Sequence, residues 1–236
     1  MSNPAWNEKA LTRIRDLDDT SRATISGTMN RAGLLIMLTI LGASVGWNQN
    51  SSAVMIGMIV LTLILCFTII FKPNLSPVLA PLYAIAEGVL LGSISAVYSI
   101  RYPGIVTNAL ILTLSIVVLM LALYRFKIIQ VTEQVRSVIM GATLAVAVTY
   151  LINMVMSFFG TQIPMIHETG WVGIGFSVVV VGVAAFNLLL DFDMIEKSER
   201  AGAPKFMEWY GGFALLVTIV WLYMEVLRLL GKVNRK

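Results

Sequence analysis

Residues 53–71 have the sequence AVMIGMIVLTLILCFTIIF, and this stretch decides the class of the protein. It holds no charged residue, and as a helix it would extend about 30 Å, which is the thickness of a bilayer's hydrocarbon core. In lipid the backbone must satisfy its own hydrogen bonds, so the stretch is predicted to be a membrane-spanning α-helix. It is too long, and too apolar on both faces, for a strand of a membrane barrel.

Six more apolar runs of similar length share this pattern, and proline and glycine fall between them. The seven predicted spans are 32–48, 53–71, 78–100, 105–124, 136–159, 171–195 and 207–230. The composition agrees, because 58% of the 236 residues are hydrophobic and 13% are charged, whereas a soluble domain is about half apolar and a quarter charged. We therefore predict an all-α membrane protein, a seven-transmembrane-helix bundle over 32–230, with a cytoplasmic N-terminal tail (1–31) and a basic C-terminal tail (231–236).

The basic residues set the expected orientation. Most of the 17 Lys and Arg residues fall in the N-terminal tail and in the loops on that side of the membrane, which predicts a cytoplasmic N-terminus. The basic C-terminal tail is the exception, and it leaves open a seventh segment that dips into the membrane without crossing it. Because the basic residues are spread over loops, the net charge of +4 does not indicate a nucleic-acid partner.

Acidic residues inside predicted spans are the candidate functional residues, since a charge near the bilayer centre costs several kcal/mol. Asp191 ranks first, because it lies about one turn inside the cytoplasmic end of the sixth span. Asn187, four residues earlier, falls on the same helix face. Asp193 lies nearer the loop and is interpreted as solvated.

Glu87 lies about nine residues into the third span, too deep for its carboxylate to reach the membrane surface easily. Gly88, Gly92 and Ser95 would let a neighbouring helix approach closely and bury this carboxylate in protein. By depth, Glu87 and Asp191 both lie in the inner half of the membrane, so they would pair if the third and sixth helices touch.

Glu225 is the fourth candidate, near the outer end of the last span and three residues before Arg228. A local ion pair is the simplest interpretation. Thr218, two turns earlier, falls close to the same face. Two carboxyl groups that share a buried site cannot both ionise cheaply, so such a pair works as a pH switch. The same oxygens suit Ca²⁺, which prefers oxygen ligands.

The sequence gives little indication of a catalytic site, a histidine-based metal site or a disulfide. The single histidine, His167, lies in a predicted outer loop, so neither a histidine-rich metal site nor a Ser-His-Asp site is expected. The single cysteine, Cys66, excludes an intramolecular disulfide. We predict no enzymatic activity and no cofactor, with Ca²⁺ as the one ion that the carboxylates could bind.

Four segments resemble a known family. They are TISGTMNRAGLL (24–35), PLYAIAEGVLLGSI (81–94), FNLLLDFDMIE (186–196) and EWYGGFALLVTIVWLYMEVLRLLG (208–231). Their order and spacing resemble a prokaryotic branch of the transmembrane Bax-inhibitor-motif family over about 24–231. The resemblance implies a seven-helix bundle with the last helix at its centre, a bacterial plasma (inner) membrane location, and a pH-sensitive Ca²⁺ leak.

In better-characterised members of that family, an aspartate ending the sixth helix pairs with a second aspartate in the seventh, and their protonation controls the pore. Asp191 matches the first. The second position falls on Thr218 when LRLLG is aligned without gaps, and on Glu225 when the LYM stretch is aligned. Either Glu87 or Glu225 substitutes for it, or this branch gates differently. Helical rise places Asp191 and Glu225 roughly 25 Å or more apart in depth, which favours Glu87 as the partner.

Two functions remain open at this point. The first is a pH-sensitive calcium leak channel in the lipid bilayer, gated by protons. Its pH-sensing and ion-pathway residues would be Asp191, Glu87, Glu225, Asn187, Thr218 and Asp193, with Asp191 as the candidate Ca²⁺ ligand. The alternative is a non-conducting membrane regulator that binds another membrane protein, such as a quality-control protease, through its N-terminal tail.

Overall fold

The computed structural model describes residues 22–49, 51–161, 163 and 170–235. The long helices are α2 (Ile25–Gly46), α3 (Ser52–Phe71), α4 (Ser76–Arg101), α5 (Ile105–Arg125), α6 (Glu133–Phe158), α8 (Trp171–Arg200) and α9 (Met207–Val233). A single 3-10 turn, Pro73–Leu75, precedes α4. Among these described residues, seven helices are long and apolar enough to cross a membrane. The predicted all-α seven-helix membrane bundle is therefore confirmed.

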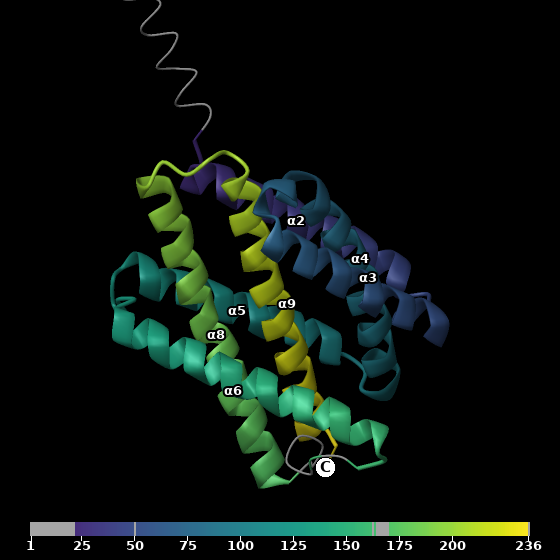
Figure 1. Cartoon of the computed structure of the whole chain (residues 1–236). Helices are drawn as coiled ribbons and strands as arrows, with labels where there is room; N and C mark the ends of the chain where they lie inside the picture. The colour runs from purple at the N-terminus through teal and green to yellow at the C-terminus, as the bar shows by residue number, and fades with distance from the viewer. Residues whose placement is uncertain (1–21, 50, 162, 164–169, 236) are drawn as a thin grey trace, which may run out of the picture.

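The last helix lies at the centre of the bundle, as predicted. α9 contacts α2, α4, α5 and α8, and Figure 1 shows it between α8 on one side and the group of α2, α3 and α4 on the other. α4 and α9 bury more than half of their most apolar segments, whereas α3 and α6 bury about a tenth and leave the rest for lipid. α9 is one continuous helix of 27 residues, about 40 Å long, which favours a full crossing over a dip.

Two helices extend past their predicted ends because polar residues continue them. α2 starts at Ile25, seven residues before the predicted span, because the Thr24 hydroxyl caps it by accepting a hydrogen bond from the Gly27 amide at 3.0 Å. α8 continues to Arg200, supported by ion pairs one turn apart in its last two turns. The short surface helix predicted in the tail lies in 1–21, outside the described residues, and so does His167.

α2 and α4 pack backbone against backbone. A Cβ added at Gly92 would lie 2.1 Å from the carbonyl oxygen of Ala43, and one at Gly88 would lie 2.2 Å from that of Thr39. A Cβ added at Gly46 of α2 would lie 2.0 Å from the carbonyl oxygen of Val89. The prediction that the α4 glycines allow close approach by a neighbour is confirmed, and the neighbour is the first helix.

The last turn of α8 and the first turn of α9 hold the start of α2. Glu208 is 1% exposed and accepts hydrogen bonds from the Thr24 amide at 3.0 Å, from the Thr24 hydroxyl at 2.9 Å, and from Lys205 at 2.8 Å. Glu199 accepts a hydrogen bond from the Ile25 amide at 2.9 Å. Both carboxylates satisfy amides that a helix N-terminus leaves unpaired, and their charge suits its dipole.

Candidate functional site

Asp191 lies in α8 and faces the central helix. Its Oδ2 atom is buried and has no hydrogen-bond partner. Thr218 of α9, 8% exposed, lies beside the carboxyl group, while its hydroxyl donates to the carbonyl oxygen of Ala214 at 3.3 Å. No ion pair within the described part of the chain involves Asp191. Thr218 is the position to which the ungapped alignment assigns the second aspartate, so a hydroxyl occupies that place here.

Asn187 joins α8 to a different neighbour. Its side-chain amide donates to the Thr143 hydroxyl of α6 at 2.7 Å and to the Val183 carbonyl at 2.8 Å. The polar side chains of Asn187 and Asp191 follow each other along α8 as the spacing predicts. They point toward different helices, however, and together they connect α8 to both α6 and α9.

The interpretation of Asp193 as a solvated carboxylate is wrong. Its side chain is 12% exposed and pairs with Arg136 at 2.5 Å and with Lys197 at 2.8 Å. Arg136 lies in the first turn of α6. This turn is far from Asp193 in the sequence and lies beside α8 only in the folded structure. Asp193 therefore ties α6 to α8, and both of its charged partners hold it in place.

Glu87 does not pair with Asp191, contrary to the prediction. The polar groups that interact with it are Thr62 of α3 and Tyr83, one turn earlier on α4, and Cys66 of α3 is also close. α9 contacts both α4 and α8 and lies between them (Figure 1). The depth estimate gave similar levels for the two carboxyl groups, but it carried no information about their lateral positions.

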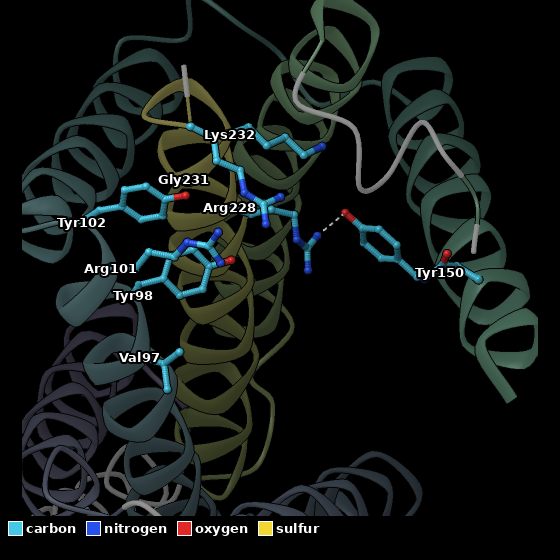
Figure 2. Close-up of a pocket in the computed structure, with 10 residues that line it drawn as sticks. Val97, Tyr98, Arg101, Tyr102, Tyr150, Arg228, Gly231 and Lys232 are labelled. Carbon is cyan, nitrogen blue, oxygen red and sulfur yellow. Dashed lines mark hydrogen bonds between the residues drawn. The ribbon is translucent and has the colours of Figure 1, made fainter. Parts of the chain in front are cut away.

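Glu225 forms the predicted ion pair with Arg228, in a buried cluster. It is 2% exposed and accepts hydrogen bonds from Arg228 at 2.8 and 2.9 Å, from Tyr150 of α6 at 3.0 Å, and from the Trp221 indole at 3.3 Å. Arg228 also donates to the Tyr150 hydroxyl at 2.5 Å, as the dashed line in Figure 2 shows. Both carboxylate oxygens of Glu225 therefore accept hydrogen bonds from neighbouring side chains.

The depth separation predicted between Asp191 and Glu225 is too large. Asp191 lies beside Thr218, which is seven residues before Glu225, a rise of about 10 Å along α9. The prediction of roughly 25 Å failed because α8 runs to Arg200, so Asp191 lies nine residues from the helix end. Even at this smaller separation the two carboxyl groups do not touch.

Tyr150 and Glu208 are two residues that the sequence analysis missed. The signal for Tyr150 was a phenolic hydroxyl within the predicted span 136–159, which holds several other polar side chains. The signal for Glu208 was a carboxylate in the first turn of a helix, where it can bind backbone amides. Neither signal identifies the partner, because Arg228 and Thr24 are both far away in the sequence.

Carboxyl groups of the described chain therefore lie at three levels along the central helix. Glu208 lies at its start, Thr218 with Asp191 lies about 15 Å further along, and Glu225 with Arg228 lies about 10 Å beyond that. In the described part of the chain, no three His, Cys, Asp or Glu side chains gather as a metal site would require. Asp191 is the carboxyl group along α9 that keeps an unpaired buried oxygen.

In the part of the chain that the structure describes, these features define an integral membrane protein of seven long helices around a central α9, with one buried oxygen of Asp191 unpaired inside the bundle. The chain matches the family described as "Bax inhibitor 1 like" over residues 3–235. It belongs to that family, which confirms the predicted resemblance at the level of the family. A comparison with curated proteins found no match.

Proposed function

We propose that this protein is a cation leak that conducts Ca²⁺ across a bacterial plasma membrane, and that a proton on Asp191 closes it. The observation that carries the proposal is the buried, unpaired Oδ2 of Asp191 against the central helix. Membership of the Bax inhibitor 1 like family supports a membrane function of this kind. The N-terminus would be cytoplasmic, in keeping with the distribution of basic residues.

The chemistry of a lone carboxyl group explains the proton control. A protonated carboxyl group can lie in the contact between α8 and α9 at little cost, whereas a carboxylate there requires water or a cation. Proton and cation then compete for the same oxygens, so cation binding falls as the pH falls. The leak is therefore expected to rise with pH and to close in acid.

Thr218 and Asn187 would assist this group in different ways. The Thr218 hydroxyl lies beside Asp191 and could offer its oxygen to a passing cation. Asn187 fixes α8 against α6 through Thr143 and so positions the turn that carries Asp191. Ca²⁺ takes six or more oxygens, and water would supply most of them during passage.

Glu225 has a structural role in this proposal, because its hydrogen bonds to Tyr150 and Arg228 already satisfy it. Glu87 faces α3 and lies outside the proposed gate. The gate thus differs from a two-aspartate switch, since one carboxyl group and one hydroxyl replace the pair.

The experiment is Ca²⁺ flux into proteoliposomes between pH 6 and pH 8. A one-proton gate changes the open fraction by at most about tenfold per pH unit, and Asp191→Asn should abolish this dependence, because the amide cannot ionise. Glu133→Gln is the matched control, since Glu133 is an exposed carboxylate at the start of α6. Glu87→Gln should also keep the pH dependence. An unaltered pH response in Asp191→Asn would refute the mechanism.

The alternative function, a non-conducting regulator, remains a prediction about the tail, and residues 1–21 lie outside the described structure. Deleting these residues separates the two functions. A leak through the bundle should persist in the shortened chain, whereas a tail-mediated regulator should lose its membrane-protein partner.

A further inference from the structure

A basic pocket of about 640 Å³ lies beside the C-terminal end of α9, between α4 and α6. Four cationic side chains line it, namely Arg101, Arg228, Lys232 and Arg235. Figure 2 shows three of them with Tyr98 of α4 and Tyr102, just after α4, on one side and Tyr150 of α6 on the other. The pocket lies at the end of the bundle opposite Asp193 and Glu208, far from the proposed gate.

The positive charge in this basic pocket exceeds the negative charge around it. Glu225 neutralises Arg228. Lys232, 6% exposed, donates to the Gly173 carbonyl at 2.8 Å, which satisfies one donor but supplies no counter-charge. Lys232 also lies close enough to Arg228 for their charges to repel each other. An anion in the pocket would relieve this repulsion.

Arg101 and Arg235 are the cations most available to a ligand. Neither forms an ion pair within residues 22–49, 51–161, 163 and 170–235. Arg101 has its guanidinium 5.8 Å from the centre of the Tyr102 ring, a contact that leaves its N–H donors available. Guanidinium groups bind phosphate oxygens in a fork geometry, which suits them to this kind of anion.

The wall of the basic pocket changes from charged to apolar along the membrane normal. Val97, 59% exposed, lies one turn from Arg101 and below the cationic groups in Figure 2. Ile100 beside it is 83% exposed, so this surface of α4 faces lipid. Tyr98 and Tyr102 occur at the level where aromatic residues mark the membrane interface. A ligand with an anionic group beside the cationic side chains and a hydrocarbon chain beside Val97 and Ile100 would match this wall.

We propose that the basic pocket binds a phosphate ester, with Arg101, Lys232 and Arg235 around the phosphate. The apolar surface at Val97 and Ile100 makes the headgroup of an anionic phospholipid the favoured source. A soluble phosphate ester has the same anionic chemistry without the chain, and the test distinguishes the two.

The test measures lipid retention on the purified full-length protein in detergent by native mass spectrometry. Phosphatidylglycerol is compared with phosphatidylcholine, and glycerol 1-phosphate is added as a soluble competitor. A basic residue near an anionic headgroup contributes about fivefold in affinity. The double variant Arg101→Gln/Arg235→Gln should therefore weaken phosphatidylglycerol binding by about 25-fold.

Lys72→Gln/Arg125→Gln is the matched control, because it removes two exposed cations near the opposite end of the bundle. It should bind phosphatidylglycerol like the wild type, and both double variants should melt like the wild type without lipid, since all four side chains are exposed. Resistance to the soluble competitor identifies a lipid as the source, and displacement by it identifies a soluble ester. Equal retention of phosphatidylglycerol by both double variants, or equal retention of phosphatidylcholine by the wild type, would overturn the proposal.

Discussion

Gly92→Ala is expected to destabilise the bundle, because α4 has no room for a side chain at this position. A Cβ at Gly92 would lie 2.1 Å from the carbonyl oxygen of Ala43, and it would be 2.8 Å from both the carbonyl carbon and the Cα of the same residue. All three atoms are backbone atoms of α2, so no rotamer change can relieve the contact. The two helices would have to separate by about 1.3 Å to reach an ordinary 3.4 Å contact.

The expected magnitude follows from two opposing effects. Overpacking a tight contact costs about 1–3 kcal/mol, and the rigidity of backbone atoms places this case near the upper value. Replacing a helical glycine by alanine stabilises the folded state by up to about 1 kcal/mol, because glycine loses more backbone freedom on folding. The net loss should be about 2 kcal/mol. In a soluble protein of this length, a loss of about 2 kcal/mol lowers the melting temperature by about 4–8 °C, and we expect the same here.

Gly57→Ala provides the control for this measurement. Gly57 lies within α3, where a Cβ would meet nothing within 4 Å, so the substitution should leave the melting temperature unchanged or raise it slightly. Both variants would be purified in the same detergent and melted side by side. A Gly92→Ala protein that melts at or above Gly57→Ala would refute the close helix contact.

Two further predictions concern the ends of the central helix. Gly27→Ala should loosen the start of α2, because its Cβ would lie 1.9 Å from a carboxylate oxygen of Glu208 and would displace that flexible group from its hydrogen bonds, at about 1–3 kcal/mol. Hydrogen exchange of the first turn of α2 measures this, and Gly33→Ala, with nothing within 4 Å, should exchange like the wild type. Glu225→Gln should lower the free energy of unfolding by about 2–3 kcal/mol, since it leaves Arg228 without its counter-charge in a largely buried site. Unfolding by a denaturing detergent checks it, and a stability equal to wild type would show that the pair contributes little.

The membrane architecture could be predicted because it depends on local properties. A run such as 53–71 is long and uncharged whatever surrounds it, so helix number and approximate bounds follow from the sequence alone. Helix ends were less certain, because polar residues continued α2 and α8 beyond the apolar runs. The cap at Thr24 could have been recognised from its residue type.

The neighbours of each helix could not be predicted in the same way. An apolar side chain packed against protein looks the same in the sequence as one that faces lipid. This is why Glu87 was assigned to Asp191 although its polar neighbours are on α3. It also explains the error at Asp193, since its partner Arg136 reaches it only once α6 and α8 lie together. The sequence could identify which groups were unusual, but their partners required the fold.

The position of α9 has a consequence for how the chain is made. Helices leave the ribosome in order, so α9, which contacts α2, α4, α5 and α8, enters the membrane after the six other long helices that the structure describes. Until it arrives, the surfaces that it covers have no permanent neighbour, and the start of α2 lacks the Glu208 carboxylate that satisfies it. A nascent or truncated product without its final segment would thus expose those surfaces to the cell's membrane proteases.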